Sequence, residues 1–274
     1  MIEIVGASDA IQLDGDDGVK LLKGTDGRFA PAFDLGERES VAREGALLQR
    51  VRAQPRDVSL PLLVYGDVRV NWRRLLSLLN PLKADVRLRW SYPDGSTRTL
   101  RGRVSGVSSR EDAASAGTSW LRVDATLRCH DPFWLSDLES LTFDLSPGEW
   151  FPMPPYAISS GVLAGKLNVN NDGDAPAWPV WQIIGPCGPF TASSGAETLL
   201  FDSPLAAEET ITIDTRPGRK TVVDGDGANR YPDLDDGASL WAIPPGTSTV
   251  DIEIPDATDD TRLLVSWQRR HLTP

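Results

Sequence analysis

The chain of 274 residues is 40% hydrophobic and 24% charged, with 24 glycines and 21 prolines, which is ordinary for a globular protein with many tight turns. It contains no apolar run long enough for a membrane span, and its first residues, MIEIVGASDA, lack the basic and apolar regions of a secretory signal. We therefore expect a protein that has no membrane span and is made and kept in a cytoplasm, or is released by a route other than secretion.

The formal net charge of −11 belongs to the second half of the chain. Residues 1–140 contain 20 Lys and Arg against 20 Asp and Glu, whereas residues 141–274 contain 8 against 19. Together with the chain length, this asymmetry predicts two domains, residues 1–138 and 139–274. An acidic second half would repel phosphates, so we expect no specific nucleic-acid partner.

The first half is predicted to consist of strands and one helix. A strand-like run covers residues 58–65, in which Pro61 indicates an edge or bulged position. In residues 68–79, apolar side chains recur at helical spacing and form one stripe: Trp72, Leu75, Leu76 and Leu79. Three arginines occupy the other side of this predicted helix, where a solvated face or a subunit contact is favoured over an anion site: Arg69, Arg73 and Arg74.

Further strands are predicted after the helix. Residues 85–90 and 96–107 should form a hairpin around a turn at residues 92–95. Residues 120–129 form another strand, with an exposed loop over 110–117 before it. The charge-rich stretch 37–50 predicts either a long loop or a short helix. The first half is therefore expected to be a mainly β domain with one packed helix.

The second half shows no helical period. Short strands separated by turn residues predict an antiparallel β-sandwich; they cover residues 138–145, 165–170, 178–184, 197–201, 210–214, 221–224, 248–254 and 261–267. Alternation within the predicted strand 178–184 places Trp178 and Trp181 on opposite faces. Trp241 and Ile243 are expected to cover the open end of the core.

The sequence lacks the residue patterns of common catalytic sites. It contains no nucleophile elbow, phosphate-binding loop or zinc motif, and Cys129 and Cys187 are expected to be buried free thiols. Neither histidine is placed like a rigid base, since His130 directly precedes Asp131-Pro132 and His271 lies near the chain end. We therefore expect no enzyme, no catalytic residues, no cofactor and no bound metal.

Acidic residues crowd one region of the second half: Asp224, Asp226, Asp233, Asp235 and Asp236. The segment from Asp224 begins like a calcium loop, but Ala228 stands where a third oxygen ligand belongs, so a solvated hairpin turn is preferred. A hydrolase with paired carboxylates is a third-ranked hypothesis, because it needs two carboxylates facing each other across a cleft.

Tryptophans in a β-sandwich suggest a second function, because aromatic faces stack on sugar rings. Most of them lie among apolar neighbours and are expected in the core: Trp178, Trp181, Trp241 and Trp267. Trp150 is the best candidate for an exposed aromatic side chain. A carbohydrate-binding module is therefore the alternative function.

Several segments, in order along the chain, resemble the distal tail proteins of long-tailed, non-contractile bacteriophages (siphophages): RDVSLPLLVYGD, NWRRLLSLLNPL, YPDGSTRTLRGRV, RCHDPFW, NDGDAPAWPVWQIIGP, YPDL…SLWAIPPGTSTV and VSWQRRHL. The resemblance covers most of the chain. It implies a mainly β fold: an N-terminal β-sandwich or split-barrel-like ring domain with one helix, followed by a C-terminal galectin-like antiparallel β-sandwich. Residues 14–50 match none of the family's segments.

The resemblance also implies a structural role at the tail tip of the virion. Copies of the chain would form a ring, commonly a hexamer, that joins the tail tube to the baseplate or host-recognition apparatus. The implied partners are other copies of the chain, the tail tube protein, and tail-fibre or receptor-binding proteins. A host-surface glycan would be the ligand in the alternative function. The family has no catalytic residues to carry over.

Overall fold

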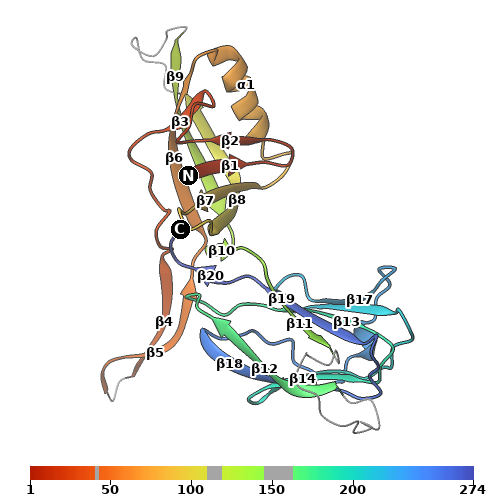
Figure 1. Ribbon diagram of the computed structural model, residues 1–274. Coiled ribbons are helices and arrows are strands. Elements are labelled where there is room, and N and C mark those ends of the chain that lie inside the picture. The colour runs from red at the N-terminus through yellow and green to blue at the C-terminus, as the bar shows by residue number, and fades with distance from the viewer. Residues whose placement is uncertain (41–42, 110–118, 145–162) are drawn as a thin grey trace. The chain divides into compact units, whose positions relative to one another are not determined.

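The computed structural model describes residues 1–40, 43–109, 119–144 and 163–274, which form two compact units (Figure 1). The first unit comprises Met1–Asp137 together with His271–Pro274, and the second comprises Leu138–Arg270. The expected loop over 110–117 and Trp150 lie outside the described residues. Within the described ranges, no helix is sufficiently long and apolar to cross a lipid bilayer.

The first unit is built on a nine-stranded antiparallel sheet whose main path runs β2-β1-β7-β8-β9-β6-β3. Its strands are β1 (Ile2–Val5), β2 (Ala10–Gln12), β3 (Val19–Leu21), β6 (Arg56–Tyr65), β7 (Val86–Ser91), β8 (Thr97–Ser109), β9 (Trp120–Cys129), β10 (Trp134–Ser136) and β20 (Arg270–His271). The Leu21 amide donates to the Leu13 carbonyl at 2.9 Å, so the two ends of the path meet and the sheet nearly closes into a barrel. The last strand, β20, pairs with β10.

The helix predicted over 68–79 is confirmed as α1 (Val68–Leu78). Asp67 caps it, because its carboxylate accepts a hydrogen bond from the Val70 amide at 3.1 Å. The buried face consists of Leu75, Leu78 and Leu79, whereas Leu76 of the expected stripe is exposed. Several leucines satisfy helical spacing here, and only packing against the sheet selects those that face the core.

Pro61 lies inside the sheet, not at its edge, because β6 is flanked by β9 and β3. Its carbonyl accepts a hydrogen bond from the Leu22 amide at 2.8 Å, just beyond the end of β3. In a strand, the N–H and C=O of one residue point to the same side. The missing N–H of Pro61 therefore faces the end of β3, and the continuous ladder between β6 and β9 is unaffected.

The two remaining strands of the first unit form a ribbon of their own. β4 (Phe33–Ser40) and β5 (Arg43–Ala53) pair antiparallel with each other, and Figure 1 shows them extending away from the barrel-like sheet of the same unit. The expectation of a loop or short helix over 37–50 was therefore wrong. A β-bulge interrupts the alternation, since Gly36 pairs with Arg50 but Glu37 pairs with Leu48.

The second unit is an antiparallel sandwich, as predicted. One sheet has the order β11 (Glu139–Asp144), β19 (Arg262–Trp267), β13 (Val180–Ile184), β16 (Thr210–Asp214) and β17 (Thr221–Asp224). The other has the order β12 (Leu163–Asn171), β18 (Gly246–Ile254), β14 (Phe190–Ser194) and β15 (Glu197–Phe201), and a short 3-10 helix, η1, covers Tyr231–Asp233. Strand β14 was not predicted. Trp181 and Ile183 of β13 face the core, and Val180 and Gln182 face outward.

Candidate functional site

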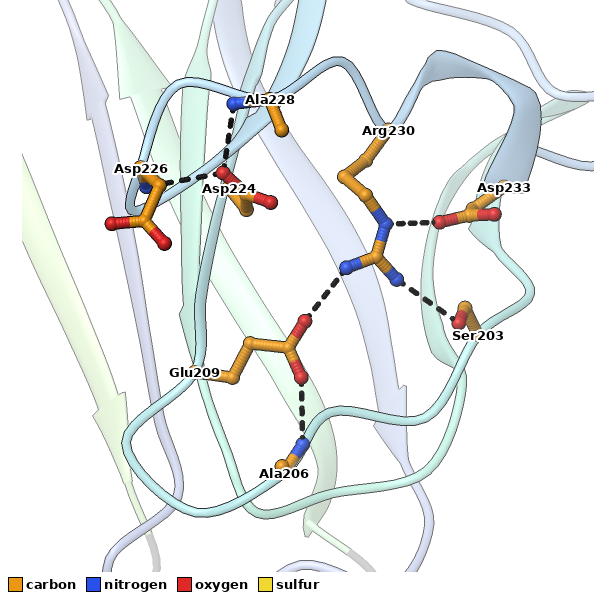
Figure 2. Close-up of polar contacts among 8 residues, drawn as sticks. All are labelled: Ser203, Ala206, Glu209, Asp224, Asp226, Ala228, Arg230 and Asp233. Carbon is orange, nitrogen blue, oxygen red and sulfur yellow. Dashed lines mark hydrogen bonds and ion pairs between the residues drawn. The ribbon is translucent and has the colours of Figure 1, made fainter.

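Three of the acidic residues noted in the sequence, Asp224, Asp226 and Asp233, lie around the turn after β17 and in η1 (Figure 2). Asp224 closes the turn, because its Oδ1 accepts hydrogen bonds from the amides of Asp226 at 3.0 Å and Ala228 at 2.8 Å. The predicted hairpin turn is therefore confirmed. Across the described ranges, no group of three or more His, Cys, Asp or Glu side chains is placed to hold a metal ion.

Arg230 binds the carboxylates on either side of it (Figure 2). Its Nη1 lies 2.7 Å from Glu209 Oε1, its Nε donates to Asp233, and its Nη2 donates to Ser203 Oγ at 3.3 Å. The second Glu209 oxygen accepts the Ala206 amide at 2.9 Å. These contacts fix two loops to each other, which is a structural task. Asp224 and Asp233 have structural partners as well, since Asp224 accepts hydrogen bonds from its own turn and Asp233 from Arg230.

The Ala206 amide and the Arg230 guanidinium hold the pKa of Glu209 below its ordinary value, because both bind the ionised carboxylate. At pH values above its unfolded-state pKa, such a carboxylate stabilises the folded chain. This stabilisation is lost as the pH falls through the folded-state pKa, which is lower. We therefore expect the second unit to lose stability below about pH 4.

The Arg230→Ala variant should raise the pKa of Glu209 toward its ordinary value and reduce the unit's stability at neutral pH. NMR titration of the side-chain carboxyl carbon and thermal unfolding between about pH 3 and 7 measure both effects. Arg219→Ala removes an exposed arginine from the same unit and is the control. An equal shift of the Glu209 pKa in this control would contradict the assignment.

Three of the tryptophans considered for sugar stacking are core residues. Trp181, Trp241 and Trp267 are at most 6% exposed, so their faces cannot receive a sugar ring. The Trp181 ring lies 5.7 Å from that of Trp241 and 5.8 Å from that of Phe190, centroid to centroid. Trp178 is half-buried. These three tryptophans therefore do not support a carbohydrate-binding module.

The two cysteines are buried free thiols, as predicted. Burial raises the pKa of Cys129 to about 12 and that of Cys187 to about 11. Both side chains remain protonated at neutral pH, which makes them poor nucleophiles. They contribute to packing in the cores of the two units.

Exposed apolar side chains gather on one face of the β4–β5 ribbon. The register places Phe33, Leu35, Leu48 and Val51 on this face, and each is 47–59% exposed. Leu47, which pairs with Arg38, lies on the opposite face. An isolated two-stranded ribbon is only marginally stable in water, and contiguous exposed apolar residues mark interaction sites. We call these four residues the apolar ribbon face.

A buried arginine fixes the chain beside this ribbon. Arg56, at the start of β6, is 4% exposed, and its Nη1 donates to the carbonyls of Arg28 at 3.1 Å and Gly27 at 3.4 Å. Its Nη2 donates to the carbonyls of Leu272 at 3.2 Å and Pro132. The guanidinium thus joins the segment before β4, the segment before β10 and the end of the chain. Burial lowers the Arg56 pKa from its ordinary value, and the guanidinium remains a cation.

Neither the ribbon nor the role of Arg56 was predicted from the sequence. Phe33-Asp34-Leu35 and Val51-Arg52-Ala53 do alternate, and this is the signal that could have indicated two strands. Arg56 has no such signal, because its partners are as far as 216 residues away in the sequence.

No family model matches the sequence, and no curated protein matches it. Several solved structures do match this chain. The SPP1 Dit protein (gp 19.1), a paradigm of the hub adsorption apparatus of phages that infect Gram-positive bacteria, matches with a TM-score of 0.69 and 13% identity, over 98% of this chain and 99% of that one. A chain of the phage P2 baseplate in its activated conformation with Ca matches with a TM-score of 0.58 and 11% identity, over 100% and 99% of the two chains.

The same baseplate with Sr gives a TM-score of 0.56 and 10% identity, over 100% of this chain and 99% of that one. At these identities the likeness concerns the fold. Both units take part in it, since almost the whole of each chain is covered. The described part of the chain therefore has the fold of the phage hub protein Dit, the fold that the resemblance to distal tail proteins implied.

Proposed function

We propose that the chain is a structural protein of a bacteriophage tail tip. Copies of it form a ring, commonly hexameric in the family it resembles, that joins the tail tube to the baseplate or host-recognition apparatus. Its location is then the virion tail. Its partners are further copies of itself, the tail tube protein, and tail-fibre or receptor-binding proteins. The match to SPP1 Dit over the whole chain supports this assignment.

The observation that carries the ring is the apolar ribbon face. Phe33, Leu35, Leu48 and Val51 are about half exposed on a ribbon that pairs with no other strand among the described residues. Covering them with another subunit removes apolar surface from water, which favours association. The charge balance of the first half, 20 cationic against 20 anionic residues up to position 140, allows two copies to approach without strong mutual repulsion.

The ring is tested by measuring the mass of the purified chain over a range of concentrations by light scattering and imaging the assemblies by electron microscopy. We expect closed rings of one defined size, either alone or after addition of tail partners. A chain that stays monomeric at every concentration, and also with tail partners, would contradict the proposal.

The variant Leu35→Ser/Leu48→Ser/Val51→Ser should weaken self-association on the order of 100- to 1,000-fold. Each of these side chains is about half exposed, so covering it contributes about half of the roughly 1.5–3 kcal/mol of a fully buried aliphatic side chain. Sedimentation velocity measures the dissociation constant. Leu47→Ser is the matched control, because this leucine is similarly exposed but lies on the other face of the ribbon. Equal weakening by the triple variant and by Leu47→Ser would argue against the apolar ribbon face as the contact.

A further inference from the structure

Four arginines lie side by side on the outer face of the barrel-like sheet. The register places Arg87 of β7 opposite Arg101 of β8, and Arg103 of β8 opposite Arg128 of β9. Arg101 and Arg103 are two positions apart in the same strand, so they share the face turned away from the buried side of β8. The four side chains therefore form a continuous row across three strands, which we call the arginine face.

This arrangement has a cost within the isolated subunit. Like charges directly opposite each other on neighbouring strands destabilise a sheet, and the row contains two such pairs. Asp85 binds both Arg101 and Arg103, each at 2.8 Å, and Asp57 binds Arg128 at 2.8 Å. Arg87 has no ion pair with any residue that the structure describes. Two carboxylates therefore serve four guanidinium groups, and the row keeps an excess of positive charge.

The carboxylate Asp85 shows how strongly this row attracts anions. Partial burial raises its pKa, but hydrogen bonds and charge attraction from Arg103 and Arg101 outweigh this effect, and the pKa lies below its ordinary value. Arg101, Arg103 and Arg128 remain 42–53% exposed, so their guanidinium groups are accessible to further carboxylates.

The second unit carries the complementary charge. Residues 141–274 contain 19 acidic against 8 basic residues. Some of the acidic side chains are exposed and form no ion pair within the described part of the chain, including two adjacent pairs: Asp235 with Asp236, and Asp259 with Asp260. Carboxylates and arginines bind one another through charge-assisted, often bidentate hydrogen bonds, which give both attraction and orientation.

We infer that the arginine face is a contact surface for the acidic second unit of a neighbouring copy of the chain. The inference rests on the proposed ring, in which one subunit presents one surface and its neighbour a different one. A protein partner is favoured over nucleic acid, because the net charge of −11 would oppose the approach of phosphates. The ionic contact adds to the apolar ribbon face, and high salt weakens the ionic contact selectively.

The test compares two variants of the full chain that have the same change in net charge. Arg87→Glu/Arg101→Glu reverses the arginine face, and Arg69→Glu/Arg73→Glu reverses two exposed arginines on α1. Sedimentation velocity at about 50 and 500 mM NaCl measures association, and circular dichroism confirms folding. We expect the first variant to associate at least tenfold more weakly than the second at low salt, with little salt dependence left. Equal association of the two variants would overturn the inference.

The acidic side of the contact is tested by Asp235→Lys/Asp236→Lys and Asp259→Lys/Asp260→Lys. At least one of these variants should associate more weakly than the wild type. When the same change is combined with Arg87→Glu/Arg101→Glu in one chain, part of the association lost in the arginine variant should return. Loss of association without restoration in either combination counts against a direct contact. A short DNA duplex is the second probe. If the wild type binds it and Arg87→Glu/Arg101→Glu does not, the arginine face binds nucleic acid instead, which would overturn the inference.

The two proposals fail in different ways. If Arg87→Glu/Arg101→Glu still forms normal rings, the arginine contact is wrong while the ring stands. If the wild-type chain remains monomeric at every salt concentration and with tail partners, both are wrong. If the apolar ribbon variant loses association and the reversed arginine face does not, the ribbon alone carries the ring.

Discussion

Replacing Arg56 with methionine should lower the free energy of unfolding of the first unit by about 2–5 kcal/mol, because hydrogen bonds from a charged donor contribute about 1.5–3 kcal/mol each and several would be lost. Methionine keeps most of the aliphatic volume, so the loss reports on the guanidinium. Four backbone carbonyls, in the segments at residues 27–28, 132 and 272, would lose a donor at once. Buried polar groups left without partners cost about 1–3 kcal/mol each, and relaxation and water entry recover part of this.

Scanning calorimetry measures this loss, and near-ultraviolet circular dichroism separates the unfolding of the two units by their different tryptophans. Arg52→Met is the control, since Arg52 is exposed on the ribbon. We expect the control to change stability by less than about 0.5 kcal/mol. If Arg56→Met were as mild, the guanidinium would not be what fixes these three segments to one another.

Trp181→Ala should lower the free energy of unfolding of the second unit by about 3–5 kcal/mol, as is usual for deleting a large buried aromatic side chain. Trp181 is 1% exposed and packs against Phe190 and Trp241 from other parts of the sandwich. The cavity left by the indole would lie between the two sheets, where neighbouring side chains can fill it only by leaving their preferred rotamers. The first unit should keep its stability.

Trp178→Ala is the matched control for Trp181→Ala, because Trp178 lies three residues away in sequence and is only half-buried. Chemical denaturation followed by tryptophan fluorescence measures both variants. We expect Trp178→Ala to cost clearly less than Trp181→Ala. A cost of similar size at both positions would contradict the assignment of Trp181 alone to the core.

Local patterns predicted the parts of the fold in which one face of an element is uniformly buried. Trp120–Cys129 alternates without interruption, and the structure contains this strand as β9 with the same bounds. Val68–Leu78 has helical spacing and a capping Asp67, and the helix is present. In such segments the local preference and the global fold agree, so the sequence alone is sufficient.

Patterns failed where tertiary contacts decide. The bulge between Gly36 and Glu37 shifts the phase of the ribbon, so no single period describes β5. Pro61 indicated an edge position, but it lies inside the sheet. Its missing N–H faces the end of β3, and this arrangement depends on where β3 stops. Strand β14 contains only two apolar residues, Phe190 and Ala192, and ends in two serines, which are typical of a turn.

The candidate sites divide in the same way. The turn at Asp224 could be predicted because an Asx turn involves only its own neighbours along the chain. The four members of the arginine face come from three strands, and no local pattern brings Arg87 and Arg128 together. The partners of Arg56 are between 28 and 216 residues away in sequence, so only the folded chain shows what this residue binds.

The return of the last four residues to the first unit makes the second unit an insertion. Asp137 leads into it and His271 leads out, so two junctions connect it to the first unit. The carbonyls of Leu272, Thr273 and Pro274 bind Arg56 and Arg98, so a chain shortened to its first 137 residues would lack these acceptors. A functional first unit alone requires a direct linkage of Asp137 to His271. For the same reason, an exchange of the second unit between chains of this fold needs two crossovers. A single proteolytic cut within Leu138–Arg270 yields two fragments, each of which still contains part of the first unit.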